Sequence, residues 1–597
     1  MNQEKNIQRS QKFLFISMMC RVGPMVFRIF PISFILFSLL GITHGASWVI
    51  GVFINQNLYD ALSNCLFHGG AIPTVYWFAV MTCLVVAGQE VLNGLHNFFW
   101  DALQKKATGK LSLGIHTKIA KLPALIFEDQ KQLDNINKAN EGMISAINMF
   151  FCFAAIFNFY LPYLIFLFAY LYGIKPLLAI SLLVIFVPTL LSHIIRAKIF
   201  SKLENESAPI RRENDHYEKC LCSRESMKET RLLGGFKFFY KLYMDTLKLL
   251  SLKEWSAEKR NGLINLGLNS LQLTGFLGVY YLLFIALMSG DVSVGVFAAV
   301  FYSVQRTFEM MSEVMSHVEN GIMKNLGKVK NYIEFLDIPF FEGISDEPDF
   351  SNGIVIDNVS FTYPYANKPS LHEISLNIGE GKTLALVGEN GSGKTTLIKI
   401  LTGLYKPITG NVYVAGLDVN ESSDQSIFSK TSGVFQHYMK YALTLAENIQ
   451  ISDFTSNNEV ESVLASTDVN TKDINTFPDS VNTILSREFG GVDLSSGQWQ
   501  RVAIARGLYR KHKFIILDEP TAAIDPIEET KIYKQFKELT KGATSIIVTH
   551  RLGSARIADL IAVMENGSIV EIGTHESLVK SNGKYAQMWL AQAQYYQ

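Results

Sequence analysis

The first 315 residues alternate long apolar runs with two strongly charged stretches. A membrane-spanning helix needs about 20 apolar residues, because it rises about 1.5 Å per residue and must cross about 30 Å of hydrocarbon. Five runs meet this requirement, and a sixth is weaker. We therefore predict an all-α membrane region of six helices, placed at residues 29–54, 71–99, 144–172, 176–195, 261–290 and 292–315.

The sixth predicted span is apolar for its first 14 residues and then carries Arg306, Glu309 and Glu313. Together with Ser303, these residues recur every three or four positions and share one face of a helix. Ionisable groups at membrane depth usually face a water-filled cavity or a partner. This face is therefore a candidate wall of a substrate cavity, with Arg306 and Glu309 spaced to pair. A position at the cytoplasmic interface and a buried soluble helix are the alternatives.

The placement of Lys and Arg predicts the orientation of the spans. Residues 101–142 contain seven Lys and residues 196–260 contain fifteen Lys and Arg, whereas residues 55–70 contain neither. Basic loops stay on the cytoplasmic side, so we expect both ends of the chain to be cytoplasmic. Long loops without structure are uncommon in ordered domains. We therefore expect both basic stretches to form helical extensions of the spans.

Basic residues, among them Lys5, Arg9, Lys12 and Arg21, precede the first apolar run, as they do in signal peptides. The run at residues 29–54 is longer than the core of a signal peptide, and further spans follow it. We expect an uncleaved first helix that follows a cytoplasmic segment at residues 1–28.

Composition adds two exclusions. Lys+Arg and Asp+Glu both number 54, so the formal net charge is zero and gives no argument for a nucleic-acid partner. The six cysteines match neither a disulfide framework nor a zinc-ligand set. We expect all six to be free thiols.

Residues from about 350 onward mix polar and apolar positions as a soluble domain does, and they carry a P-loop. The apolar strand 384–387 leads into the pattern G-x-x-x-x-G-K-[ST], and a helix is predicted at 395–401. This strand–loop–helix context is the one in which backbone N–H groups and a helix N-terminus surround phosphates. The motif comprises Gly388, Glu389, Asn390, Gly391, Ser392, Gly393, Lys394 and Thr395, with Thr396 following. Lys394 is expected to reach the phosphates of ATP, and Thr395 to bind Mg²⁺.

A second buried-strand run, residues 514–517, ends in Asp518 and Glu519. After a P-loop, such an acidic pair suits Mg²⁺ binding by Asp518 and activation of the attacking water by Glu519. A simple helix cap is the alternative.

Leu494, Ser495, Ser496, Gly497 and Gln498 lie between these motifs, followed by a helical run at 499–509. This arrangement resembles the ABC ATPase family, whose signature is Leu-Ser-Gly-Gly-Gln. The resemblance covers residues 354–585 and implies an α/β P-loop NTPase fold with ATP and Mg²⁺ as ligands. The chain is then multidomain, with a transmembrane domain at 29–325, a linker at 326–350 and an ABC ATPase domain at 351–597.

The resemblance also implies roles for single residues. Tyr363 matches the aromatic residue that stacks on adenine. Gln436 matches the glutamine that contacts Mg²⁺ and the attacking water, and His550 the histidine that contacts the γ-phosphate. The expected catalytic residues are therefore Glu519, Gln436 and His550.

Two acidic residues are expected to act between subunits or domains. Asp525 lies in the loop that crosses between subunits in this family, and Glu488 matches its coupling acidic residue. Two positions depart from the family pattern, Ser496 in the signature and Ala522 before the crossing loop. We expect these departures to affect the rate rather than abolish activity.

The chain has one P-loop and one signature, and no internal repeat. In the ABC family each ATP lies between the P-loop of one copy and the signature of another. The resemblance therefore implies a dimer, most simply of two identical chains, with a heterodimer of related halves as the alternative.

Six spans fused to a C-terminal ATPase resemble bacterial exporters of the cytoplasmic membrane. Residues 435–441 and 490–500 resemble the same stretches of lantibiotic and other bacterial peptide exporters. We therefore expect a peptide cargo, with a lipid flippase or multidrug exporter as the alternative. A membrane sensor or scaffold without transport is a hypothesis of another class, against which the intact Glu519 counts.

Overall fold

The computed structural model divides the chain into two units. The first contains residues up to 118 and residues 135–338, and the second contains residues 119–134 and 339–597. The structure describes residues 2–519 except 341, 365 and 457, together with 533, 536–538 and 540–594.

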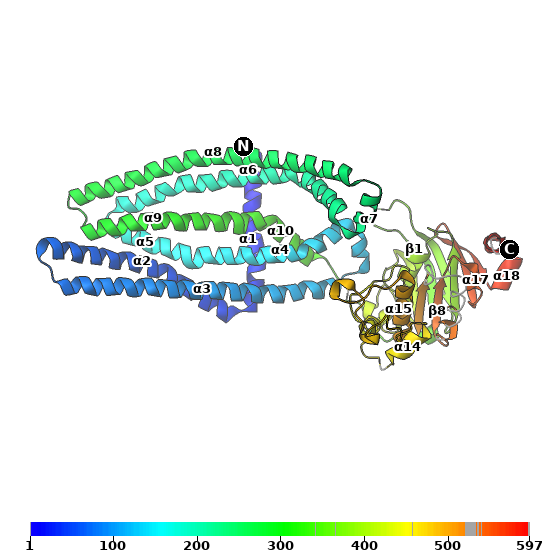
Figure 1. The fold of residues 1–597 in the computed structure, drawn as a ribbon. Coiled ribbons are helices and arrows are strands. Elements are labelled where there is room, and N and C mark those ends of the chain that lie inside the picture. The colour runs from blue at the N-terminus through cyan, green and yellow to red at the C-terminus, as the bar shows by residue number, and fades with distance from the viewer. Residues whose placement is uncertain are drawn as a thin grey trace. The chain divides into compact units, whose positions relative to one another are not determined.

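Long helices make up the first unit, and Figure 1 shows most of them running side by side. They are α1 (Asn2–Ile29), α2 (Pro31–His68), α3 (Ile72–Ile119), α4 (Gln130–Ala155), α5 (Leu161–Ile174), α6 (Pro176–Cys222), α7 (Arg224–Leu232), α8 (Phe236–Met288), α9 (Val294–Ser316) and α10 (Leu326–Asp337). A π-helical turn, η2 (Ile156–Tyr160), joins α4 to α5, and α3 and α4 both extend into the second unit.

Local sequence explains where these helices begin and end. Pro31 and Pro176 occupy the first turns of α2 and α6, where proline lacks only an N–H that has no helical partner. The preceding residues, Phe30 and Lys175, leave the helical conformation, as residues before proline tend to do. α2 ends at Gly69, whose φ of 68° is the left-handed conformation that a helix C-cap requires.

Among the residues that the structure describes, four stretches are long and apolar enough to cross a membrane. They are Pro31–His68, Ile72–Ile119, Gln132–Ile174 and Phe236–Met288. The two other predicted spans, 176–195 and 292–315, fall within α6 and around α9. Only 6% of the apolar window of α3 is buried within the chain, which leaves its surface for lipid or for another subunit.

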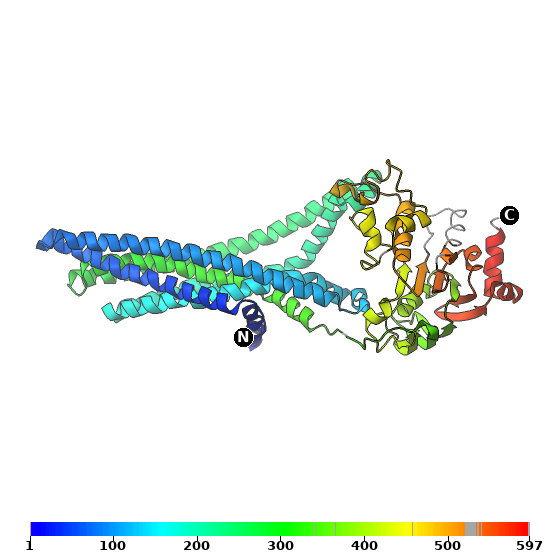
Figure 2. The same ribbon diagram turned by 90° about the horizontal axis from the view of Figure 1, so that it is seen from below.

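The two basic stretches are helical, as the sequence predicts. α3 runs on to Ile119, and α6 and α8 pack against each other along their lengths. Figure 2 shows the ends of α6 and α8 leaving the other helices together.

The structure adds three details to the sequence analysis. The basic stretch at 196–260 is interrupted, because α7 ends at Leu232 and α8 begins only at Phe236. Residues expected as an N-terminal segment and as a linker also form helices α1 and α10. All six cysteines are free thiols, as predicted.

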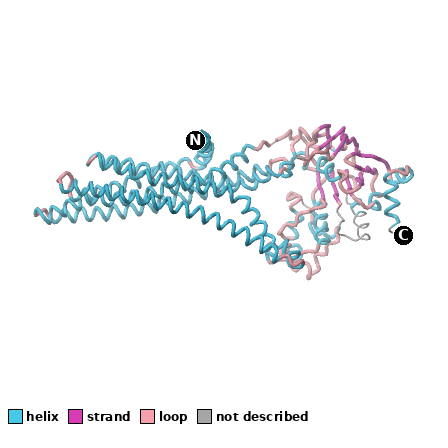
Figure 3. The backbone as a smooth tube through the Cα atoms, turned by 90° about the horizontal axis from the view of Figure 1, so that it is seen from above, coloured by secondary structure: helices cyan, strands magenta, loops and turns pink. Residues whose placement is uncertain are grey.

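The second unit contains the strands, which Figure 3 shows gathered in the C-terminal part of the chain. Among the described residues they form an antiparallel sheet in the order β2-β1-β4-β5 and a six-stranded sheet in the order β10-β9-β3-β8-β7-β6. In the second sheet β9, β3, β8, β7 and β6 are parallel. The strands are β1 (Ile354–Phe361), β2 (Leu371–Ile378), β3 (Thr383–Gly388), β4 (Thr409–Val414), β5 (Leu417–Asp418), β6 (Thr431–Val434), β7 (Phe514–Asp518), β8 (Thr544–Val548), β9 (Leu560–Glu565) and β10 (Ser568–Gly573).

Helices complete the second unit. A large hydrophobic core lies around α11 (Lys394–Leu401). Leu397 and Ile400 of α11 are fully buried in this core with Leu384 and Leu386 of β3. β3 and α11 are therefore fixed on both sides of the loop that joins them. The remaining helices include η1 (Ala124–Glu128), α12 (Asp424–Phe428), α13 (Leu445–Gln450), α14 (Val460–Ser466), η7 (Arg487–Phe489), α15 (Ser496–Tyr509), α17 (Leu552–Ala555), α18 (His575–Lys580) and α19 (Lys584–Gln594).

Replacing Gly142 of α4 by Ala should destabilise the first unit. The new Cβ would collide with the carbonyl oxygen of Lys328 and lie 2.8 Å from Cβ of Tyr332, both in α10. Overpacking of this kind costs about 1–3 kcal/mol. We expect the thermal unfolding midpoint of the detergent-purified chain to fall.

Gly109→Ala in α3 is the matched control, because open space surrounds this glycine in the structure. Its gain in helix propensity of about 1 kcal/mol should keep or raise the midpoint. Equal midpoints for the two variants would contradict the close packing of α4 on α10.

Candidate functional site

The loop between β3 and α11 needs glycine at two positions, because neighbouring backbone lies too close for a side chain. A Cβ on Gly388 would collide with the carbonyl oxygen of Met564. Gly393 has a φ of 103°, and a Cβ there would lie 2.8 Å from the carbonyl oxygen of Ser370. The backbone of this loop can therefore approach a ligand that a larger residue would exclude. The helix that follows places its N-terminal N–H groups at the loop.

Lys394, the first residue of α11, folds back over this loop. Its Nζ donates to the carbonyl oxygens of Gly388 and Glu389, both at 2.9 Å, and the residue is only 6% exposed. Burial lowers the pKa of Lys394, while the neighbouring charges of Glu519 and Asp518 act to raise it. Oγ of Ser392 is buried and has no hydrogen-bond partner among the described residues. A phosphate group would give the hydroxyl of Ser392 an acceptor and the ammonium group of Lys394 an anionic partner. The loop therefore fits ATP.

The parallel strands beside β3 bring three further polar residues to one place. Gln436 follows β6, Glu519 follows β7 and His550 follows β8, and these strands are neighbours in the sheet. Nε2 of Gln436 donates to Oε2 of Glu519 at 3.1 Å, and Nδ1 of His550 lies 3.5 Å from the same oxygen. The three expected catalytic residues thus meet at the carboxyl ends of the strands, where open α/β sheets bind ligands.

Asp518 is the last residue of β7 and is 3% exposed. Burial, and then the nearby charge of Glu519, raise its pKa to about 6. A cation would stabilise the charged form of this carboxylate. Thr395, the exposed second residue of α11, supplies a hydroxyl oxygen at the loop. Together with the amide oxygen of Gln436, these are oxygen donors of the kind that Mg²⁺ prefers.

Tyr363 lies after β1 and faces the start of α11. Its hydroxyl is 3.2 Å from Oγ1 of Thr396, and its ring packs edge-on against Phe361 and Tyr405, with centroids 5.2 Å and 5.9 Å away. Nζ of Lys399 lies 5.8 Å from the centre of the same ring. The aromatic residue expected to stack on adenine is thus held against the helix that begins at the phosphate loop.

Glu128, at the end of the turn η1, lies near this site and was not predicted from the sequence. Its Oε1 accepts hydrogen bonds from the hydroxyl of Tyr405 and from Nζ of Lys399, the latter at 3.1 Å. These two bonds lower the pKa of Glu128. Because Glu128 lies more than 270 positions from Lys399 and Tyr405, no local pattern announces the contact.

The signature residues form the start of α15. Ser495 is its N-cap: Oγ of Ser495 accepts from the backbone N–H of Gln498 at 3.3 Å, and Oε1 of Gln498 accepts from the backbone N–H of Ser495 at 2.8 Å. Such a capping box satisfies two N–H groups of the first turn. Ser496 is exposed in that turn and its carbonyl oxygen accepts from the hydroxyl of Tyr438 at 2.9 Å. The helix start is therefore retained despite the departure at Ser496.

The remaining predicted features are the signature, Glu488 and the loop with Ala522 and Asp525. No hydrogen bond or ion pair among the described residues joins the signature at 494–498 to the phosphate loop at 388–396. Glu488 lies in the short turn η7 before the signature. Asp525 and Ala522 fall outside the described residues.

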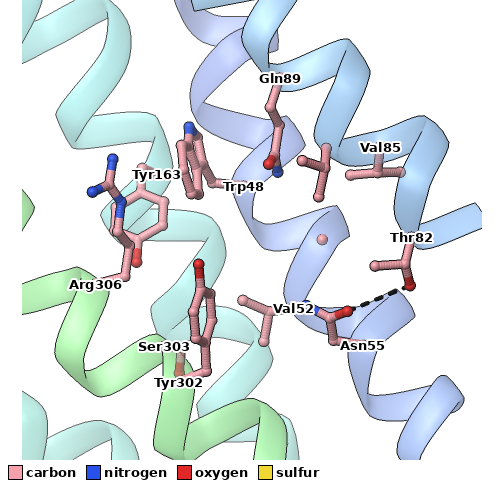
Figure 4. A pocket seen from close by; sticks show the side chains of 12 residues that line it. Trp48, Val52, Asn55, Thr82, Val85, Gln89, Tyr163, Tyr302, Ser303 and Arg306 are labelled. Carbon is pink, nitrogen blue, oxygen red and sulfur yellow. Dashed lines mark hydrogen bonds between the residues drawn. The ribbon is translucent and has the colours of Figure 1, made fainter. Parts of the chain in front are cut away.

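The four candidates in the first unit have different surroundings. Ser303 is 1% exposed and, with Arg306, lines a pocket (Figure 4). Nη1 of Arg306 lies 2.6 Å from Oε2 of Glu309, so the two residues pair as their spacing predicts. Glu313 instead accepts a hydrogen bond from the hydroxyl of Tyr160 at 2.9 Å.

Comparison with known proteins matches both units. Residues 371–522 match the ABC transporter family. The subtilin transport ATP-binding protein SpaT of Bacillus subtilis is 29% identical over 563 residues, which span 90% of this chain and 88% of SpaT. The solved structure of a bacterial Atm1-family ABC exporter with ATP bound shares the fold, with a TM-score of 0.77 and 21% identity, over 94% of this chain and 98% of that one.

Other relatives match over a shorter stretch. The nisin transport ATP-binding protein NisT of Lactococcus lactis subsp. lactis is 35% identical over 244 residues, or 39% of this chain and 40% of NisT. An ATP-dependent lipid A-core flippase of Blochmanniella pennsylvanica is 38% identical over 253 residues, or 42% of this chain and 43% of the flippase.

Glu519→Gln should leave ATP binding intact and slow hydrolysis. The amide keeps the size of the carboxylate but cannot accept a proton from water, and loss of such a group costs about 10²–10⁴-fold in rate. Phosphate release and nucleotide binding by the purified chain are the two measurements. Glu380→Gln, an exposed acid in the turn between β2 and β3, is the matched control. Hydrolysis by Glu519→Gln at the control's rate would contradict the assignment.

Proposed function

We propose that this chain, an ABC transporter ATPase domain fused to a membrane domain, is one half of a dimeric exporter whose cargo is a peptide. It is a membrane protein that couples ATP hydrolysis to transport. The proposal places it in a bacterial cytoplasmic membrane with both ends of the chain in the cytoplasm. The proposed ATPase activity rests on the contacts of Glu519 with Gln436 and His550 beside the phosphate loop.

The residues of the site suit phosphoryl transfer to water. Phosphoryl transfer depends on positioning and charge stabilisation more than on covalent chemistry. Lys394 and the N–H groups of the loop hold the phosphates, and His550 contacts the γ-phosphate. Glu519 accepts the proton of a water that Gln436 orients. Thr395, Asp518 and Gln436 would hold Mg²⁺, which neutralises charge on the phosphate oxygens.

The proposed dimer follows from the separation of two half-sites in one chain. The start of α15 offers N–H groups and the positive end of a helix dipole, which suit a phosphate. This helix start has no bond to the chain's own phosphate loop among the described residues. A second copy would bring its signature to that loop and complete the site. Two identical chains then form two such sites.

Coupling to the membrane helices is proposed to pass through Glu128. The turn η1 connects α3 to α4, and Ala124 and Leu125 pack against the core of the second unit. Glu128 binds Lys399 and Tyr405, which also contact the ring of Tyr363. Binding of adenine at Tyr363 therefore acts on residues that hold η1. A ligand shifts such an equilibrium only through different affinities for the two states, and ATP has this property if only the closed dimer contacts both of its faces.

The peptide cargo is supported by where the relatives match. The subtilin transporter matches over 90% of this chain, so the similarity includes the membrane helices. The nisin transporter and the lipid A-core flippase of B. pennsylvanica both match over about the size of the ATPase domain, so these two matches do not separate the cargoes. Shared motors and folds do not specify cargo. A match that includes the helices therefore weighs more, and it agrees with the resemblance to lantibiotic exporters.

Uptake into inside-out membrane vesicles tests this proposal. Vesicles that contain the chain are given a peptide pool and ATP, and the peptides that accumulate inside are identified by mass spectrometry. We expect ATP-dependent enrichment of particular peptides, which vesicles with Glu519→Gln lack. Wild-type vesicles that hydrolyse ATP yet enrich no peptide would contradict the peptide cargo. Movement of labelled lipid into the leaflet that faces the vesicle lumen would then favour the flippase alternative.

A further inference from the structure

A small pocket lies among the membrane helices of the first unit. Its volume is about 50 Å³, and side chains from α2, α3, α5 and α9 surround it (Figure 4). The lining residues are Trp48, Gly51, Val52, Asn55, Thr82, Val85, Val86, Gln89, Tyr163, Tyr302, Ser303 and Arg306. Arg306 is the one charged residue among these twelve, so the pocket favours an anionic group.

The pocket lies at the depth of the hydrocarbon layer. Arg306 is 12 residues from Val294, where α9 begins, which places it about 18 Å along the helix at 1.5 Å per residue. The pocket residues of α2 and α3 lie within two of the stretches that are long and apolar enough to cross about 30 Å of hydrocarbon. Ionisable residues at such depth generally serve a transport pathway or a partner.

Arg306 is held in the pocket but is not fully bonded. Its guanidinium carbon lies 4.3 Å from the ring centre of Trp48, and Nη1 is paired with Glu309. Nε is buried and has no hydrogen-bond partner among the described residues. A guanidinium group has five N–H donors, so the pair with Glu309 leaves others for a ligand. A buried donor without an acceptor is unfavourable, and a ligand acceptor would remove that cost.

The residues around Arg306 are fixed by bonds of their own. Nε1 of Trp48 donates to Nε2 of His44 at 3.2 Å, which sets the position of the ring that Arg306 stacks on. Nε2 of Gln89 donates to the carbonyl oxygen of Ser47 at 2.9 Å. The hydroxyl of Tyr163 lies 3.0 Å from Oγ1 of Thr307. The pocket is therefore preformed, which reduces the entropy lost on binding.

We propose that this pocket binds one carboxylate group of the cargo, with Arg306 as its cationic partner. The inference rests on the proposed peptide cargo and specifies how the peptide is recognised. A planar guanidinium matches a planar carboxylate through two parallel hydrogen bonds. A cavity needs about 10–15 Å³ of such volume to admit one water molecule, so the pocket has room for a group of a few non-hydrogen atoms, such as a carboxylate. The carboxylate belongs either to the C-terminus of the peptide or to an Asp or Glu side chain.

Three sets of synthetic peptides with otherwise matched sequences test the proposal in inside-out vesicles of the full-length chain. The first set has a free C-terminus and no acidic residue, the second has an amidated C-terminus and no acidic residue, and the third is amidated but contains one Glu. We expect the first or the third set to accumulate about tenfold more than the second, because a charged hydrogen bond is lost in the second. The favoured set identifies the source of the carboxylate.

Variants then assign the preference to Arg306. Arg306→Gln should remove the preference for carboxylate peptides, and Arg306→Lys should keep part of it, since the charge stays but the planar fork is lost. Arg196→Gln is the matched control, because Arg196 pairs with Glu319 at 3.0 Å and does not line the pocket. It should keep the wild-type preference.

The outcomes separate this inference from the proposed function. Accumulation of none of the three sets by ATP-hydrolysing wild-type vesicles would overturn the peptide cargo and the inference with it. Equal accumulation of all three sets would leave peptide export standing and overturn the carboxylate pocket. An unchanged preference in Arg306→Gln would also overturn the carboxylate pocket. The variant used for this comparison must elute as the wild type does in size-exclusion chromatography.

Discussion

The parallel register of β3, β8, β7 and β6 is the constraint on which the rest of the motor depends. It brings the ends of four strands to one edge, so that the phosphate loop, His550, Glu519 and Gln436 meet although they are spread over more than 160 positions. The strands can hold this register because their side chains, such as Leu386, Ile516 and Ile547, are fully buried. Burial also raises the pKa of Asp518, and the buried hydroxyl of Ser392 has no partner among the described residues, so this edge suits a cation and a phosphate group.

We propose that a second chain completes this edge and that Glu128 connects it to the membrane helices. The capped start of α15 presents N–H groups without a ligand, while Glu128 of the turn between α3 and α4 binds Lys399 and Tyr405 next to Tyr363. One nucleotide could thus contact a second chain on one side and act on the membrane domain on the other. In the first unit, Arg306 stacks on Trp48 at the separate pocket where we propose that a carboxylate of the cargo binds.

Features carried by a continuous run of sequence could be predicted, and features made by distant residues could not. The strand, loop and helix around Lys394 follow from local pattern, as do the long helices and the pair between Arg306 and Glu309. Glu128 and the pocket residues Trp48 and Gln89 were missed, because their partners come from other helices or from the other end of the chain. The break between α7 and α8 was also missed, although the adjacent glycines 234 and 235 favour a turn and Gly234 has a φ of 68°.

Mixed dimers test the shared site most directly. Lys394→Ala disables the phosphate loop, and Gly497→Asp places a negative charge in the signature, so each variant alone should be inactive. Co-expressed with different affinity tags and purified through both, the two variants form a mixed dimer that keeps one intact loop facing one intact signature. The account predicts that this dimer recovers ATPase activity, whereas a wild-type chain paired with a chain carrying both changes does not. Activity in the second pair, or none in the first, would contradict a site shared between two chains.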